Sequence, residues 1–183
     1  VEMLSGDTAE AIASTLQGQI SSLIVPHDIQ LSNCQVARIS KPRFSFEKID
    51  TNAIERALKL FRSGKNIALL IGHRALRKAG LAAAQRIQNA TGCELLTINF
   101  PGFMERGVGY PVVQRIPYFP QQAIPAVSKF DGVVLAGAKE PVTFFGYTGI
   151  QGRLLTKQQK KVYVSNEKQN AIEALELLAD ALD

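Results

Sequence analysis

Few cysteines and no long apolar run set the first limits on this sequence. Cys34 and Cys93 are the only cysteines among 183 residues, too few for a disulfide framework and not spaced as metal ligands. No apolar run approaches the roughly 20 residues that cross a bilayer. The first twenty residues also lack the basic flank and apolar core of a signal peptide. These absences lead us to expect a cytoplasmic protein with no membrane contact.

The motifs of common nucleotide-binding and catalytic sites are also missing. The segment that would carry a Gly-x-Gly-x-x-Gly fingerprint has glycine only at Gly72 and Gly80, and the phosphate-loop pattern is absent. His27 and His73 are the only histidines, and neither has an evident serine or cysteine nucleophile beside it. No carboxylate pair, metal cluster or triad can be assembled. The residues therefore predict no catalytic site.

The net charge of +5 is not arranged as in a nucleic-acid-binding protein. Its two basic clusters have no stacking aromatic residues between their charges, and they suit solvated helix faces or a small anionic ligand. We therefore expect no nucleic-acid partner. The clusters are Lys157, Lys160 and Lys161, and Arg74, Arg77 and Lys78.

What the sequence does contain is a regular alternation of apolar strands and amphipathic helices. With 46% apolar and 20% charged residues, the chain can form one domain with a proper core. Strands that are apolar throughout are buried on both faces, as in parallel sheets covered by helices. The pattern predicts a Rossmann-like, three-layer α/β fold with a doubly wound, mostly parallel sheet of about six strands. The predicted strands are residues 66–72, 93–100, 132–138 and 160–166, and the predicted helices are residues 50–64, 73–92, 121–130 and 168–183.

The first 48 residues have a different pattern. Residues 7–20 are typical of a helix capped by Asp7 or Thr8, and residues 22–25 are typical of a short strand ended by Pro26. A polar stretch without a persistent period follows, which predicts a linker over residues 33–48. Residues 101–120 are also predicted to be irregular.

The carboxyl ends of the predicted strands are the candidate ligand site, because open parallel sheets bind ligands beyond those ends. Glycine after a strand lets the main chain approach a ligand, and the start of the next helix offers amide groups to phosphate. Arg74 and Lys139 stand within two residues of such glycines, where they could meet a diphosphate. Glycine is also common after strands simply because the chain must turn there. A nucleotide site and an ordinary turn therefore both remain possible explanations of these glycines. The four ends are residues 72–74, 100–102, 137–139 and 165–167.

Several segments resemble a known family. Residues 105–124 (ERGVGYPVVQRIPYFPQQAI) and 130–149 (FDGVVLAGAKEPVTFFGYTG) are similar to the middle domain of thiamine-diphosphate-dependent enzymes. The closest likeness is to acetolactate synthase large subunits, and a more distant one is to benzoylformate decarboxylase. Residues 54–76 and 82–96 resemble the start of the same domain, and residues 21–29 (SSLIVPHDI) resemble the end of the family's first domain.

The resemblance implies a larger, three-domain enzyme. Residues 1–32 would be the last helix and strand of the preceding pyrimidine-binding-type domain, and residues 49–183 the central, nucleotide-binding-like domain. In the family, the first domain supplies a glutamate that activates thiamine diphosphate. The third supplies a Gly-Asp-Gly…Asn motif for Mg²⁺ and the diphosphate, and neither is visible here. The implied partners are the missing N- and C-terminal domains within a homo-oligomer, and this segment alone would not be catalytic.

In some members of the family the central domain holds FAD or an adenine nucleotide, and in the acetolactate synthases this flavin is structural. The present sequence departs from the family pattern, because a triple glycine is reduced to Gly72-His73 and an arginine is replaced by Lys139, with Glu140 behind it. These side chains would narrow the groove and add a negative charge near a diphosphate. Carried over to this sequence, the cofactor contacts are Gly72, His73, Arg74, Phe100, Pro101, Gly137, Ala138 and Lys139.

Three functional hypotheses follow. The first, from the resemblance, is a structural, FAD- or ADP-binding central domain of an acetolactate synthase-like enzyme. The full-length form would decarboxylate a 2-oxo acid and transfer the carbanion, in branched-chain amino acid biosynthesis. The second is a stand-alone nucleotide-binding or regulatory α/β module without catalysis. The third is a small independent enzyme that uses His73 and Lys139.

Overall fold

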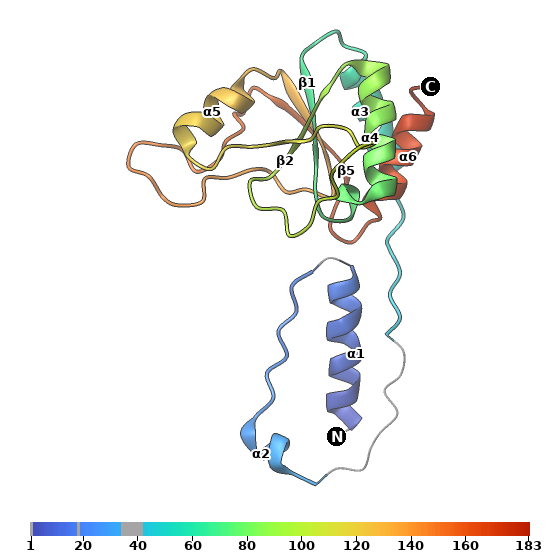
Figure 1. The fold of residues 1–183 in the computed structure, drawn as a ribbon, viewed down its shortest axis with the longest axis vertical. Coiled ribbons are helices and arrows are strands. Elements are labelled where there is room, and N and C mark those ends of the chain that lie inside the picture. The colour runs from blue at the N-terminus through green and yellow to red at the C-terminus, as the bar shows by residue number, and fades with distance from the viewer. Residues whose placement is uncertain (1, 18, 34–41) are drawn as a thin grey trace. The chain divides into compact units, whose positions relative to one another are not determined.

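A sheet of five parallel strands forms the centre of residues 47–183 (Figure 1). The strands are β1 (Ile67–Ile71), β2 (Glu94–Thr97), β3 (Gln114–Arg115), β4 (Gly132–Ala136) and β5 (Lys160–Ser165). Their order is β3-β2-β1-β4-β5, and every neighbouring pair is parallel. This computed structural model, which describes residues 2–17, 19–33 and 42–183, confirms the predicted α/β class with a parallel sheet flanked by helices.

Helices cover the two faces of the sheet unequally. The helices of this unit are α3 (Thr51–Phe61), α4 (Lys78–Thr91), α5 (Pro120–Ser128) and α6 (Ala171–Asp180), with a short 3-10 helix, η1 (His73–Leu76). Helices α3, α4 and α6 lie together on one side of the sheet, and α5 lies on the other (Figure 1). On that second side, the loop residues Leu154 and Leu155 complete the core.

The central strands are apolar at every position because each of their two faces is buried. In β1, Ile67, Leu69 and Ile71 pack into the core under α3, α4 and α6, whereas Ala68 and Leu70 pack into the core under α5. Strand side chains alternate between the faces of a sheet, so a strand with helices or loops on both sides has no position that faces water.

Two helix starts and one helix end in this unit have well-defined caps. Asp50 Oδ1 accepts a hydrogen bond from the Asn52 amide at 3.0 Å at the start of α3. At the start of α6, Asn170 Oδ1 accepts one from the Ile172 amide at 3.2 Å. Helix α4 ends at Gly92, whose φ of 72° lies in the left-handed region that glycine tolerates.

Two local predictions within this unit need correction. The predicted helix over 73–92 is η1 followed by α4, with an extended residue, Arg77, between them. Gly80 makes this break possible, because a Cβ at that position would overlap the carbonyl oxygen of Ala75. The stretch 101–120 is not wholly irregular either, since β3 adds two residues to the edge of the sheet through Leu96 and Thr97 of β2.

The first unit, Val1–Phe46, contains α1 (Glu2–Leu16) and α2 (His27–Leu31). Helix α1 starts before the predicted caps, because Asp7 and Thr8 lie inside an already regular helix. The predicted strand over 22–25 is wrong: within the described part of the chain those residues have no ladder partner, and a strand needs one to satisfy its backbone groups. Most of the predicted linker, with Cys34, lies outside the described residues.

None of the helices in the described part of the chain has the length and apolar character that crossing a bilayer requires.

Candidate nucleotide-binding site

The strand order creates a switch point between β1 and β4. From β1 the chain moves outward to β2 and β3, and it then returns to the other side of β1 as β4. In open parallel sheets, such a reversal leaves room for a ligand beyond the carboxyl ends of the two strands. Gly72 follows β1 and Gly137 follows β4. The two central glycines of the predicted site therefore lie at the switch point.

These two glycines pack directly against each other. A Cβ at Gly72 would lie 2.6 Å from the Gly137 carbonyl oxygen, and a Cβ at Gly137 would lie 3.0 Å from the Gly72 carbonyl oxygen. A Cβ at Gly137 would also come within 2.8 Å of the Ala171 Cβ at the start of α6. Gly137 in addition has a φ of +60°, which side chains rarely tolerate. Close packing and a turn thus account for both glycines without a ligand.

The amide groups of these glycines already have partners within the protein. The Gly72 amide donates to the Ala136 carbonyl at 3.1 Å. The Gly137 amide donates to the Ser165 hydroxyl at 2.9 Å, in a fully buried hydrogen bond. A phosphate would have to displace these bonds to use the amides, and a buried polar group that loses its partner is costly. The main chain at these glycines is therefore not preorganised for a diphosphate.

His73 and Arg74 start the 3-10 helix η1 that follows Gly72. His73 is exposed and has a φ of 47°, which puts it in the left-handed region that histidine enters more often than most residues. The Ala75 amide donates to the Gly72 carbonyl at 3.0 Å, which closes this turn. Since η1 is a four-residue helix, it offers only a weak dipole to an anion.

The two charged residues after β4 both have partners of opposite charge. The Lys139 ammonium lies 2.5 Å from a carboxylate oxygen of Glu167, in the loop after β5. Glu140, which is largely buried, pairs with Lys161 at 2.9 Å and with Arg153 at 3.5 Å. The sequence led us to expect the negative charge of Glu140 near a bound diphosphate. In the structure this carboxylate instead pairs with two cations.

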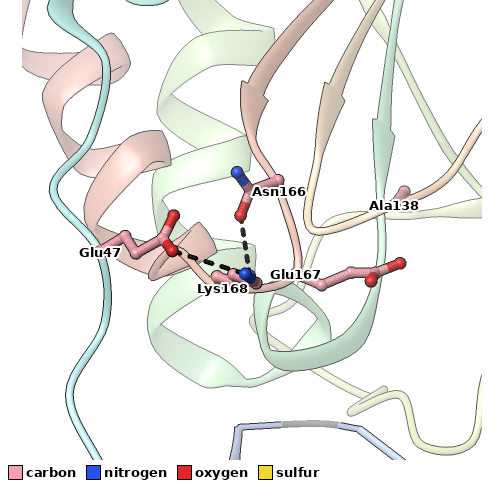
Figure 2. Close-up of a pocket in the computed structure, with 5 residues that line it drawn as sticks. All are labelled: Glu47, Ala138, Asn166, Glu167 and Lys168. Atoms are coloured by element: carbon pink, nitrogen blue, oxygen red, sulfur yellow. Dashed lines mark hydrogen bonds and ion pairs between the residues drawn. The ribbon is translucent and has the colours of Figure 1, made fainter.

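A hollow of about 470 Å³ opens beside these residues, at the carboxyl ends of β4 and β5. Figure 2 shows Ala138 on one side of it and the loop after β5 on the other. The Lys168 amide donates to Asn166 Oδ1 at 2.8 Å, and the Lys168 ammonium lies 3.9 Å from a Glu47 carboxylate oxygen. The lining residues are Glu47, Ala138, Asn166, Glu167 and Lys168.

The chemistry of the hollow favours a ligand that has both hydroxyl and anionic groups. Glu47 and Glu167 can accept hydrogen bonds from hydroxyls, as acidic residues do from ribose in dinucleotide sites. Lys168 and the neighbouring Lys139 can meet an anionic group, although each now pairs with a carboxylate. Within the described part of the chain, no His, Cys, Asp or Glu cluster could hold a metal ion.

The sequence predicted some of these residues and missed others. Ala138 lines the hollow and Lys139 pairs with one of its walls. Phe100 instead contacts Tyr118 and Phe144 in an aromatic cluster, with ring centroids 5.6 and 5.7 Å apart.

Glu47 gave no sequence signal. It reaches the hollow because its amide donates to the Lys168 carbonyl at 2.9 Å, across more than a hundred residues of sequence.

Comparisons with known proteins give the family context of this geometry. No family model matches the chain. A protein of Mycobacterium tuberculosis (strain ATCC 25618 / H37Rv) named "Putative acetolactate synthase large subunit IlvX" is 37% identical over 179 residues, which are 97% of this chain and 34% of that protein. A solved structure, "X-ray structure of a putative thiamin diphosphate-dependent enzyme isolated from Mycobacterium smegmatis", shares the fold with a TM-score of 0.57 at 18% identity.

The solved structure matches 84% of this chain but only 31% of its own chain. The present chain thus spans about a third of the length of each of these two relatives. Over nearly all of its residues, the chain is similar in sequence to about a third of a protein named as a putative acetolactate synthase large subunit, and it shares its fold with part of the solved structure.

Proposed function

We propose that this chain is the central domain of an acetolactate synthase-like, thiamine-diphosphate-dependent enzyme. The full-length enzyme would decarboxylate a 2-oxo acid and transfer the resulting carbanion to an acceptor, in cytoplasmic branched-chain amino acid biosynthesis. Residues 1–32 would end the preceding domain and residues 49–183 would form the central one. The observation that carries this proposal is the 37% identity over 97% of the chain, which matches only 34% of the relative.

Thiamine diphosphate and Mg²⁺ would be bound by the outer domains of a homo-oligomer. In the described residues no acidic or histidine cluster fits Mg²⁺. When bound there, thiamine diphosphate supplies the carbanion-stabilising chemistry. The role of the present residues would be to hold the outer domains in register on a rigid sheet.

The central domain would also bind an adenine nucleotide, ADP or the ADP part of FAD, in the hollow after β4 and β5. Because the amides of Gly72 and Gly137 are already bonded, the phosphates would be held by lysine side chains instead. Lys139 is the closest candidate, because it pairs with the lining residue Glu167. The Glu47 carboxylate, which also lines the hollow, would accept hydrogen bonds from the ribose.

Two experiments test the catalytic half of the proposal. The reading frame on both sides of this segment should encode a glutamate-bearing first domain and a Gly-Asp-Gly third domain. Their absence would favour the stand-alone nucleotide-binding or regulatory module. The chain alone, given pyruvate, thiamine diphosphate and Mg²⁺, should release no CO₂, whereas the full-length protein should. Turnover by the isolated chain would overturn the assignment.

Calorimetric titration with ADP tests the nucleotide half. Lys139→Ala should weaken ADP binding about threefold to tenfold, since it removes a charge-assisted contact. Glu167→Gln should strengthen binding, because it removes the carboxylate that competes for Lys139. Lys157→Ala, an exposed lysine that does not line the hollow, is the charge-matched control and should change little. Equal effects of the two lysine substitutions would indicate nonspecific electrostatic attraction. If the wild-type chain gives no binding heat with ADP or FAD, the domain has a purely structural role.

A further inference from the structure

A second hollow, of about 360 Å³, lies in the loop that joins β2 to β3. Its wall is formed by residues 104–107 and 110–113 and by Arg115 of β3, and its volume is within the range of small-molecule sites. It shares no lining residue with the hollow after β4 and β5. All the charged residues of the segment 105–115 (ERGVGYPVVQR), and its tyrosine, line this hollow, and the proposed function gives them no role.

The carboxylate in this wall, that of Glu105, is already engaged within the protein. One of its oxygens accepts a hydrogen bond from the Tyr110 hydroxyl at 3.2 Å, and the other lies 4.0 Å from the Arg77 guanidinium. Arg77 also lies over the Phe103 ring, 3.4 Å from the ring centroid, and a cation is attracted to the face of an aromatic ring. Glu105 and Arg77 therefore balance each other's charge.

The two arginines of the wall have no such partner. Arg106 and Arg115 are both exposed, and neither guanidinium forms an ion pair or a hydrogen bond with any residue that the structure describes. A guanidinium presents its N–H donors in a fixed planar fork, which matches two oxygens of a phosphate or a carboxylate. Because Glu105 is balanced by Arg77, the hollow has two uncompensated positive charges, both on groups suited to an oxyanion.

We propose that this hollow binds a small phosphate ester, whose phosphoryl group is held by Arg106 and Arg115. A phosphate monoester has close to two negative charges at neutral pH, which balances both guanidinium groups, whereas a single carboxylate would balance one. The organic part of the ester would contact Met104 and Val113, which line the hollow and pack against the core under α3, α4 and α6. The inference depends neither on the nucleotide site nor on the proposed catalytic parent.

Calorimetric titration of the full chain with phenyl phosphate, at neutral pH and constant ionic strength, tests the proposal. Inorganic phosphate should bind more weakly, because it lacks the apolar part. Succinate should bind about tenfold more weakly than phenyl phosphate, because its two charges lie on separate carboxylates and cannot share one fork-like contact. In an NMR titration with phenyl phosphate, the Gly107 and Val113 amides beside this hollow should shift, and the Ala138 amide beside the other hollow should not.

Three variants test the role of the arginines in phenyl phosphate binding. Arg115→Gln should weaken it about tenfold, since it removes one charge-assisted contact. Arg115→Lys keeps the charge but loses the planar fork, so it should weaken binding less, about threefold. Arg62→Gln is the control, because Arg62 is exposed and does not line the hollow, and it should leave binding unchanged. Both arginines are exposed, so all three variants should keep the circular dichroism spectrum of the wild type.

Four results would overturn the inference. The first is that the wild-type chain does not bind phenyl phosphate. The second is equal weakening by Arg115→Gln and Arg62→Gln, which would show nonspecific attraction to a basic chain. The third is tighter binding of succinate, which would identify a carboxylate site. The fourth is an NMR shift at Ala138 in place of Gly107, which would put the phosphate in the hollow after β4 and β5 and would support the proposed nucleotide site instead.

Discussion

The contact between Gly72 and Gly137 gives the sharpest test of why the strands end in glycine. Replacing Gly137 with alanine adds one methyl group at a φ of +60°, 2.8 Å from the Ala171 Cβ and 3.0 Å from the Gly72 carbonyl oxygen. The matched control is Gly92→Ala, at a φ of +72° with no atom within 4 Å of the added Cβ. Both changes place an alanine in the left-handed region, and only one places it in a filled space.

The expected cost of each substitution follows from these two terms. A left-handed backbone costs a non-glycine residue roughly 1–2 kcal/mol, which both variants incur. An extra methyl group in a well-packed site costs typically about 1–3 kcal/mol, which only Gly137→Ala incurs. The entropy lost by the unfolded chain when glycine becomes alanine is the same in both and cancels in the comparison. Gly137→Ala should therefore be about 1–3 kcal/mol less stable than Gly92→Ala.

Urea unfolding followed by circular dichroism measures both free energies. Gly137→Ala/Ala171→Gly should recover part of the loss, because it removes the closer of the two contacts and leaves the one with Gly72. A double-mutant cycle over positions 137 and 171 should then give a coupling free energy of about 1 kcal/mol or more, as for residues in direct contact.

The reasoning would be refuted if Gly137→Ala cost no more than Gly92→Ala. In that case the packing of the glycines would not be what requires glycine after β4. If the same variant lost ADP affinity at unchanged stability, close approach of a ligand would be the remaining explanation.

Two further predictions concern the core. Burial raises the pKa of the Cys93 thiol above its ordinary value of 9.0, so the folded chain should hold that proton to higher pH than the unfolded chain does. The stability from this difference is complete below pH 9.0 and is lost as pH rises beyond it. Measured by urea unfolding between about pH 8 and 10.5, the free energy of unfolding should fall less steeply with pH in Cys93→Ala than in the wild type. An equal fall in both would contradict the raised pKa of Cys93. Gln159 is buried, donates to the Val127 and Phe130 carbonyls at 2.8 Å, and accepts from the Thr156 amide at 2.9 Å. Gln159→Met should lower the free energy of unfolding by about 2–4 kcal/mol, because it leaves these three backbone groups unpaired. Gln158→Met, on the exposed neighbour, should lower it little. Similar losses in the two variants would show that the hydrogen bonds of Gln159 are dispensable.

The sequence predicted the sheet well because burial on both faces leaves a simple pattern. Strands β1 and β4 are apolar at every position, as is typical of parallel strands that are covered on both faces. The two-residue strand β3 was missed because its exposed residues, Gln114 and Arg115, show neither alternation nor an apolar run. The strand predicted over 22–25 had the right composition but no ladder partner among the residues that the structure describes, and composition cannot supply one.

The candidate site was only partly predictable, for a different reason. Ala138 and Lys139 follow an evident strand, so their position at its carboxyl end could be read from the chain. Two other features depend on loops that meet across the end of the sheet. Glu47 lines the same hollow as Ala138, and Lys139 pairs with Glu167. The same holds for Ser165, whose hydroxyl accepts the hydrogen bond of the Gly137 amide.

By itself, the sequence determined the α/β class, the central strands, several helix ends and the similarity to a putative acetolactate synthase large subunit, because each depends on neighbouring residues or on direct sequence similarity. The tertiary structure alone decided what lies opposite each strand end. It showed that Gly72 and Gly137 fill each other's space, and that Phe100, Tyr118 and Phe144, from three separate segments, meet in one aromatic cluster. Contacts between residues far apart in the chain depend on how loops close over the sheet, and a local sequence pattern does not predict that closure.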